Sequence, residues 1–147
     1  MQQLTIVKIG GNGIDASAAL QTFLRDFSAI EGDKILVHGG GKIATQMSER
    51  LGIPTTMING RRVTDAATLE VVTMVYGGLV NKTIVAQLQA RDCNAIGMTG
   101  TDANILTARQ RPAEPTDYGF VGDVETVNTN ALLALLAAGM TPVVAPL

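Results

Sequence analysis

Within its first fifty residues the chain twice places a short apolar run before a cluster of glycines and then an amphipathic segment. Residues 4–9 (LTIVKI) and 34–38 (KILVH) each have the composition of a buried β-strand, and glycines follow both. Helices are predicted over residues 17–28 and from the second glycine cluster to about residue 51, because apolar side chains recur there three or four positions apart. Strands that alternate with helices form parallel sheets covered by helices. We therefore expect an α/β fold, a three-layer αβα sandwich with a mainly parallel sheet.

Turn and capping signals place the shorter elements. Asn59-Gly60 lies between two short extended runs in residues 54–63, and this dipeptide is the strongest local signal for a two-residue hairpin. The other predicted elements are core strands over residues 95–98 and 141–145, an antiparallel ribbon over residues 105–127, and a last helix capped by Asn128 or Thr129 and ended by Gly139.

A long helix is predicted over residues 65–91, with Thr64 or Asp65 as its N-cap. Gly77 and Gly78 lie in its middle, where each costs roughly 1 kcal/mol of helix stability relative to alanine. Such a pair is understandable if another surface must approach the helix closely. We therefore expect a homodimer formed through this helix.

Length and composition limit the possible functions. At about 150 residues per domain, the 147 residues correspond to one domain. The net charge of −2 and the 3% of aromatic residues argue against nucleic acid or an anionic membrane surface as a partner. Cys93 is the only cysteine, so it forms no internal disulfide, and it is expected to be a structural thiol because no base is near it in the predicted fold. The first residues lack the pattern of a signal peptide. These features favour a cytoplasmic location.

The glycine turns after the first two strands are the strongest candidates for a binding site. Ligands of open α/β sheets bind at the carboxyl ends of the strands, where backbone N–H groups at helix N-termini attract phosphate or carboxylate. Lys8 lies in the first strand just before the first glycines, so its ammonium group is expected at this edge. A lysine there suits phosphoryl transfer, which depends on positioning and electrostatics. The alternatives are a solvated lysine on an edge strand and glycines that only permit tight turns.

Three familiar patterns are incomplete in this chain. The near match to a dinucleotide fingerprint at residues 11–16 lacks an acidic residue at the end of the second strand, where His38 stands. The second glycine cluster is not followed by the Ser or Thr that a Walker loop needs. The cluster also matches the oxyanion motif of some esterases, but no serine of the chain stands in the Gly-x-Ser-x-Gly segment that those enzymes need. His38 is the only histidine and has no Cys or His companions, so we expect no metal site. His38 is instead expected to organise the glycine turn through a hydrogen bond.

Five segments together resemble one family. They are VKIGGN, LVHGGGK, NGRRVTD, MTGTDANIL and DYGFVGDV. In this order they are similar to segments of the N-acetylglutamate kinases, in the amino-acid kinase family, over nearly the whole chain. The resemblance implies the amino-acid kinase (carbamate kinase-like) fold and an enzyme that phosphorylates the side-chain carboxylate of N-acetyl-L-glutamate, or a similar N-acyl-glutamate, with ATP and Mg²⁺. This reaction belongs to arginine biosynthesis.

The resemblance also implies roles for residues near the first glycine turn. Lys8 matches the catalytic lysine that stabilises charge on the transferred phosphoryl group. Gly10 and Gly11 match the glycines whose N–H groups face that phosphoryl group.

A second group of matching positions is implied to bind the acyl-amino-acid substrate. Gly40 and Gly41 match the glycine pair that holds it, and Arg62 matches the arginine that grips its α-carboxylate. The hairpin over residues 54–63 matches a lid over the substrate. Both roles make physical sense, because a guanidinium group binds a carboxylate well and a mobile hairpin excludes water from a site. The alternative for Arg62 is an exposed hairpin arginine. Two roles are open for Asp102: it lines the site, or it caps a turn.

Members of this family have about twice this length, and their carboxyl half carries the ATP site. Residues 1–147 are therefore expected to form an N-terminal, N-acetylglutamate-binding domain that is inactive by itself, with ATP and Mg²⁺ bound mainly by the absent carboxyl half. Two alternatives remain: a non-catalytic module that binds an acyl-amino acid, and a related kinase for another small carboxylate.

Overall fold

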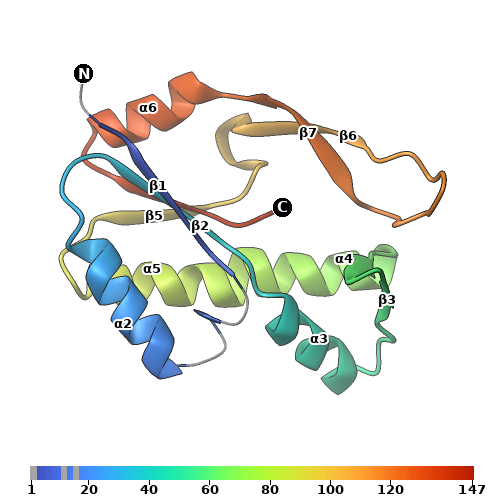
Figure 1. The fold of residues 1–147 in the computed structure, drawn as a ribbon. Helices are drawn as coiled ribbons and strands as arrows, with labels where there is room; N and C mark the ends of the chain where they lie inside the picture. The colour runs from blue at the N-terminus through green and yellow to red at the C-terminus, as the bar shows by residue number, and fades with distance from the viewer. Residues whose placement is uncertain (1–2, 11–12, 15–16) are drawn as a thin grey trace.

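The centre of the molecule is a parallel four-stranded sheet in the order β1-β2-β8-β5 (Figure 1). The computed structural model describes residues 3–10, 13–14 and 17–147 of the chain. The strands are β1 (Thr5–Ile9), β2 (Lys34–His38), β5 (Ala95–Met98) and β8 (Thr141–Val144). β1 and β2 are in register from Thr5 opposite Lys34 to Ile9 opposite His38, so both strands end at the same edge. The predicted α/β fold with a mainly parallel sheet is therefore confirmed.

One face of the sheet is covered by α2 (Ser17–Ser28) and by a single long helix, Ala66–Gln89. The long helix consists of α4 (Ala66–Val72), the π-helical η1 (Thr73–Val80) and α5 (Asn81–Gln89). Asp65 is its N-cap, because the Asp65 side chain accepts a hydrogen bond from Thr68 N at 2.8 Å. The helix thus begins and ends within two residues of its predicted limits.

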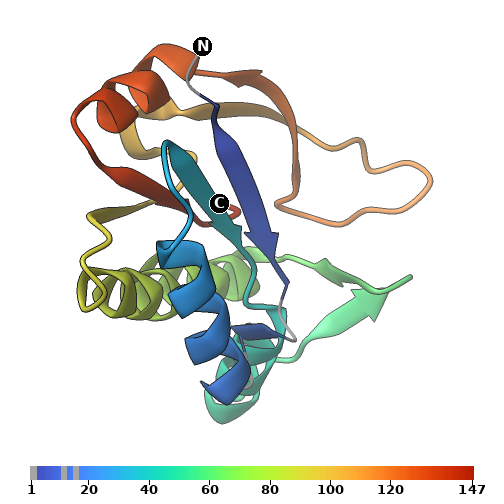
Figure 2. The same ribbon diagram turned by 60° about the vertical axis from the view of Figure 1, so that its left-hand side comes forward.

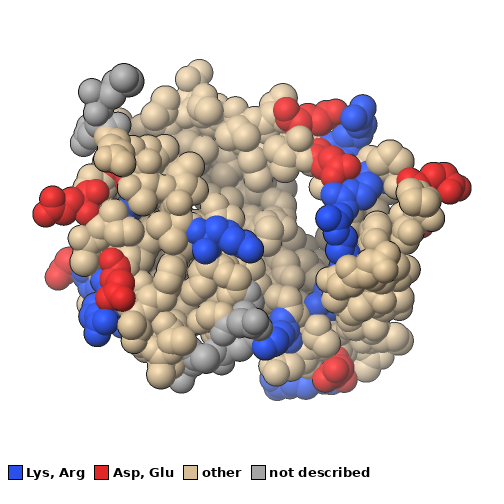
Figure 3. All heavy atoms as spheres, in the orientation of Figure 1, with Lys and Arg blue, Asp and Glu red and all other residues tan. Residues whose placement is uncertain are grey.

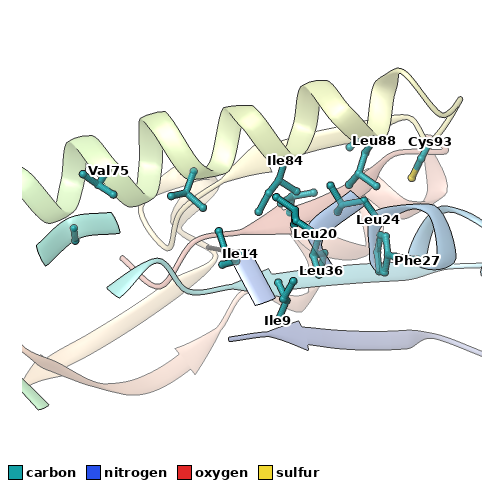
Figure 4. Close-up of a cluster of buried hydrophobic side chains, with 14 of the residues drawn as sticks. Ile9, Ile14, Leu20, Leu24, Phe27, Leu36, Val75, Ile84, Leu88 and Cys93 are labelled. Carbon is teal, nitrogen blue, oxygen red and sulfur yellow. The ribbon is translucent and has the colours of Figure 1, made fainter. Parts of the chain in front are cut away.

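The main core lies between these helices and the sheet. Figure 4 shows Ile84 and Leu88 pointing from the long helix towards the sheet and α2, with Val75 nearer the other end of the same helix. Leu36 of β2 and Val143 of β8, both fully buried, meet them from the sheet. The helix Ala66–Gln89 is also long and apolar enough to cross a membrane, by length and composition alone, a property that was not predicted from the sequence. One third of the apolar window of this helix is buried, and those buried side chains pack in the main core.

The opposite face of the sheet is partly covered by α6 (Thr129–Ala137). The Asn128 side chain caps this helix by accepting a hydrogen bond from Ala131 N at 3.2 Å, and Gly139, with φ +71°, follows its end. Both capping predictions are confirmed. A smaller buried cluster lies beneath the helix and consists of Ile35, Met98, Ile105, Leu136 and Val144.

The predicted ribbon is an antiparallel pair, β6 (Leu106–Gln110) and β7 (Gly122–Val127), and the short helix η2 (Asp102–Asn104) precedes it. The ribbon extends beyond the sheet (Figures 1 and 2). A cavity of about 1180 Å³ lies beside it, with Ile6, Phe120 and Val124 among its lining side chains. Figure 3 shows a hollow below the ribbon on this side of the molecule.

A second hairpin lies on the same side of the molecule (Figure 2). It follows α3 (Gly41–Arg50) and consists of β3 (Thr56–Ile58) and β4 (Arg61–Val63), joined through Asn59 and Gly60, which both have positive φ. The predicted hairpin is therefore confirmed.

The two hairpins are joined by backbone hydrogen bonds at Thr64. Its N–H donates to Tyr118 O at 2.9 Å, and its carbonyl accepts from Phe120 N at 2.8 Å. Gly119, between those two, has φ +71°, and a Cβ there would lie 2.3 Å from Thr64 O. Only glycine permits this close approach.

Candidate functional site

A cavity of about 610 Å³ opens where β1 and β2 end. It is lined by both glycine turns, by the start of α3 and by one side of the β3–β4 hairpin. The lining residues are Lys8, Gly10, Gly13, Gly39, Gly40, Gly41, Lys42, Thr45, Met57, Arg62 and Tyr76. Five of the six residues predicted for the site are therefore brought together, and the sixth, Gly11, lies outside the described residues.

The second glycine turn connects β2 to the N-terminus of α3. Gly39 N donates to Ile9 O at 3.1 Å, which holds this turn against the end of β1. Gly40 is the N-cap of α3 at φ 158°, and a Cβ there would lie 3.1 Å from two carbons of the Tyr76 ring. A side chain at position 40 would therefore clash with the wall of the cavity. The arrangement leaves a helix N-terminus next to the cavity, which favours an anionic ligand.

Arg62 connects the hairpin to this turn. Its Nη2 donates to Gly41 O and to Thr45 Oγ1, each at 2.8 Å, and its Nη1 lies 3.4 Å from Thr55 Oγ1. The side chain is half-buried, so the alternative of an exposed hairpin arginine is wrong. Because a guanidinium group has five N–H donors, these three hydrogen bonds leave two for a ligand.

Lys8 lies on β1 at the edge of the cavity, with an exposed side chain. Its residue pairs with Val37 of β2, so it stands one step before the glycine turns. Lys8, Lys42 and Arg62 are the charged residues that line the cavity in the described part of the chain, and all three are cationic. This set fits carboxylate or phosphate groups. Among the described residues no group of three or more His, Cys, Asp or Glu side chains lies together to hold a metal ion.

His38 is buried directly beneath the second glycine turn. Its Nδ1 lies 2.8 Å from Gly39 O, so the hydrogen bond predicted for this residue is present. Burial lowers the pKa of His38 below its usual value of 6.5, and the hydrogen bond to Gly39 opposes this shift only in part. The imidazole is therefore neutral at pH 7.

Asn81, a fully buried residue of α5, was not predicted from the sequence as part of this region. Its Nδ2 lies 3.0 Å from His38 Nε2 and 2.9 Å from Val143 O. One signal could have identified it: Asn81 stands at the same helical spacing as Ile84 and Leu88, on the stripe that faces the core. A polar residue on such a stripe needs buried partners.

The structure also changes the interpretation of Tyr76 and of the helix glycines. Tyr76 packs against the main core, and its side chain also lines both cavities. A Cβ at Gly77 would lie 3.4 Å from atoms of Thr99 and Leu147, so Gly77 is approached closely by this chain itself. A Cβ at Gly78 would meet nothing within 4 Å, so only Gly78 leaves an open approach from outside.

The two remaining candidates are structural. Asp102 Oδ2 accepts hydrogen bonds from Thr99 N at 2.6 Å and from Thr99 Oγ1 at 3.0 Å. It therefore caps the turn after β5 and does not line the cavity at the glycine turns. Cys93 is buried, with its Sγ 3.7 Å from Thr141 Oγ1, as expected for a structural thiol.

Comparisons with solved structures identify the fold. A protein from Streptococcus mutans UA159 matches with a TM-score of 0.82 and 24% identity, over 97% of this chain and 58% of that one. N-acetylglutamate synthase from Neisseria gonorrhoeae, solved with coenzyme A and N-acetyl-glutamate, matches with a TM-score of 0.75 and 23% identity, over 96% of this chain and 32% of that one. At this identity the likeness shows a shared fold.

Comparisons of sequence are more specific. The chain is 60% identical over its whole length to the acetylglutamate kinase of Cytophaga hutchinsonii and 58% identical over 99% of its length to that of Phocaeicola vulgatus. These matches cover 56% and 57% of the two relatives, so the chain spans about half the length of the curated relatives it matches. Residues 3–147 match the amino acid kinase family. The chain therefore belongs to the amino acid kinase family.

Proposed function

We propose that residues 1–147 form the substrate-binding half of an acetylglutamate kinase and that this half carries the catalytic lysine. The observation that carries the proposal is the cavity in which Lys8, the Gly39–Gly41 turn and Arg62 meet. The names and the 60% identity of its relatives support the choice of N-acetyl-L-glutamate as substrate. A cytoplasmic location fits such a biosynthetic role and the reduced Cys93.

In this proposal Arg62 binds the α-carboxylate of N-acetyl-L-glutamate with the donors that its contacts to Gly41 and Thr45 leave. Gly40 and Gly41 hold the body of the substrate, whose side-chain carboxylate then lies towards Lys8. A carboxylate oxygen attacks the γ-phosphorus of ATP, the bond to the β-phosphate oxygen breaks, and acyl phosphate and ADP are formed. The Lys8 ammonium, with the N–H groups of Gly10 and Gly11, stabilises the negative charge on the transferred group.

Mg²⁺ and most of the contacts to ATP are assigned to a carboxyl half like that of the longer relatives. The cationic cavity fits the phosphoryl group, but its described lining holds no carboxylate for the metal ion. Positioning of reactants supplies roughly 7–11 kcal/mol of such a reaction, so the chain alone is expected to have no useful rate.

The decisive experiment is complementation in trans. The purified 147-residue chain is expected to bind N-acetyl-L-glutamate in calorimetry without forming acyl phosphate from ATP. Adding the carboxyl half of the Cytophaga hutchinsonii relative should restore phosphorylation, and Lys8→Ala should abolish the restored activity while substrate binding is kept. Steady acyl phosphate formation by the chain alone would contradict the proposal.

Arg62→Met tests the assigned carboxylate contact, because methionine keeps the apolar stem and removes the charge. Loss of a charge-assisted hydrogen-bonding pair should weaken binding of N-acetyl-L-glutamate by about 1.5–3 kcal/mol. The matched control is Arg61→Met on the neighbouring, exposed residue, where no change is expected. A difference below about twofold for Arg62→Met would remove Arg62 from the site.

A module that binds the acyl-amino acid without chemistry is the second candidate, because the cationic lining and the helix N-terminus at the cavity suit binding of a carboxylate whether or not phosphoryl transfer follows. Such a module would bind N-acetyl-L-glutamate but would gain no activity from any carboxyl half. A related kinase would instead bind another small carboxylate in preference to N-acetyl-L-glutamate.

We also propose a homodimer formed through helix 65–91. Met74 and Leu79 expose apolar side chains on the long helix, and the open space at Gly78 lies between them. Gly78→Leu is expected to convert the dimer to a monomer, which a mass measurement in solution would detect. A monomeric parent chain, or a dimer that persists in the variant, would contradict this interface.

A further inference from the structure

A buried chain of hydrogen bonds connects the central sheet to the second glycine turn through the long helix. Asn81 is fully buried at the start of α5, and His38 is 1% exposed at the end of β2. Asn81 Nδ2 contacts both Val143 O of β8 and His38 Nε2, and His38 Nδ1 contacts Gly39 O.

The proton positions in this chain follow from its two ends, Val143 O and Gly39 O, which are carbonyl oxygens and can only accept. Val143 O is a carbonyl oxygen, so the atom of Asn81 that faces it is the amide nitrogen. Lys82 Nζ, 3.3 Å from Asn81 Oδ1, fixes the same orientation of the amide. The second amide hydrogen therefore points to His38 Nε2, which must accept. The proton of the neutral imidazole then lies on Nδ1 and is donated to Gly39 O.

The last bond of the chain fixes the orientation of a peptide group at the cavity. The Gly39 carbonyl is held towards the buried imidazole. In a trans peptide the N–H points opposite to the carbonyl, so the N–H of Gly40 is directed away from His38. Gly40 lines the cavity and is the N-cap of α3, where a wrongly turned peptide would alter the anion-binding end of the helix.

The fit around Asn81 is close on its other side as well. A Cβ at Gly97 of β5 would lie 1.9 Å from Asn81 Oδ1, so the amide fills the space that a side chain at position 97 would need. Asn81 therefore has one position and one orientation.

We infer that Asn81, acting through His38, is a positioning residue that sets the substrate-binding geometry of the Gly39–Gly41 turn. The inference rests on the proposed function for the identity of the ligand, but not for the hydrogen-bond chain itself. Neither residue is expected to touch the substrate.

The test begins with Asn81→Asp, which preserves size but replaces the donating nitrogen by an oxygen. Nitrogen–proton coupling spectra of the only histidine report which ring nitrogen carries the proton. The parent chain at pH 7 is expected to show the proton on Nδ1 alone. In Asn81→Asp the proton is expected to move from Nδ1 to Nε2, which then donates to the aspartate oxygen, so Nδ1 no longer donates to Gly39 O and the amide resonances of Gly39–Gly41 are expected to shift.

Calorimetry with N-acetyl-L-glutamate gives the functional readout. Loss of the orienting hydrogen bonds should weaken binding about tenfold in Asn81→Asp. Asn128→Asp is the matched control, because it also loses an amide donor, the one from Nδ2 to Ala103 O, while it keeps the oxygen that caps α6, and Asn128 does not line the cavity at the glycine turns. It should leave both binding and the histidine spectrum unchanged.

If Asn81→Asp does not fold, the pair His38→Asn and His38→Leu replaces it. An asparagine amide can still donate to Gly39 O, whereas leucine cannot, so His38→Asn should bind within about threefold of the parent and His38→Leu about tenfold more weakly.

Several results would overturn the inference. They are a parent histidine protonated on Nε2, unchanged glycine resonances in Asn81→Asp, equal binding by that variant and the parent, or equal binding by the two His38 variants. A parent chain that fails to bind N-acetyl-L-glutamate at all would instead overturn the proposed function. The histidine and glycine spectra would then decide the positioning role by themselves.

Discussion

On one face of the sheet, α2 and the long helix enclose a continuous buried cluster, whereas on the other face α6 covers only part of the same strands. Leu36 of β2 is fully buried on the first face, but Ile6 of β1 is 63% exposed and lines the cavity of about 1180 Å³ on the second. The sequence gives both positions the same aliphatic character. Burial therefore depends on which element lies over the side chain, and the glycine turn that lines the proposed site is supported from the closely packed face.

The largest loss of stability is expected when a cavity is created on the packed face, which is the face of the sheet covered by α2 and the long helix. Leu36→Ala removes a fully buried side chain between the sheet and the long helix, where neighbouring groups cannot collapse freely. The free energy of unfolding should fall by about 2–5 kcal/mol. Urea unfolding followed by circular dichroism measures this loss. A loss below about 1 kcal/mol would mean that this face is not packed as described.

Overfilling the same face should have the next largest effect. Gly97→Ala places a methyl group 1.9 Å from Asn81 Oδ1 and 2.9 Å from Val85 Cγ2. The clash should lower the free energy of unfolding by about 1–3 kcal/mol. In an Asn81→Ala background the additional loss from Gly97→Ala should be smaller, because the nearest clashing atom is gone. Additive losses in the two backgrounds would contradict the contact.

Because His38 is buried on the packed face, the free energy of unfolding is expected to fall as the pH is lowered. Because the pKa of His38 is lower in the folded chain than its usual 6.5, the unfolded chain binds a proton first as the pH falls. The contribution of His38 to stability is therefore complete above pH 6.5 and is lost below it, with a slope of at most about 1.4 kcal/mol per pH unit. Comparison with His38→Gln between pH 7 and pH 5 isolates this dependence from that of the carboxylates. If the free energy of unfolding changes with pH in the same way in both proteins, this contribution of His38 is excluded.

The smallest effect is expected on the open face. Ile6→Ala shortens a side chain that is already mostly in water, so the free energy of unfolding should change by less than about 0.5 kcal/mol. This variant is the matched control for Leu36→Ala, since both residues are aliphatic and lie on adjacent strands. A loss approaching that of Leu36→Ala would show that Ile6 is covered in solution.

Elements whose signals lie within a few residues were predictable from the sequence. Asn59-Gly60 requires the positive φ angles of a tight hairpin turn, and the structure has them. Asp65 and Asn128 accept hydrogen bonds from N–H groups three residues later, and Gly139 follows the end of α6. The position of Lys8 and of the glycines at one edge was also predictable, since parallel strands end together.

Contacts between distant segments were decided only by the tertiary structure. The sequence does not show that β8 lies between β2 and β5, or that the long helix contains a π-helical turn. Lys34 begins a buried strand because its Nζ donates to the carbonyls of Ser28 and Ile30, at 2.8 and 2.6 Å.

The hydrogen bonds of Asn81 are also contacts between distant segments, since its partners stand 43 and 62 residues away in the chain. Local chemistry determined the turns, the caps and the strand ends, because their partners are near in sequence. The partner of a buried polar group and the cover over a sheet face depend on the whole fold, because folding alone brings those atoms together.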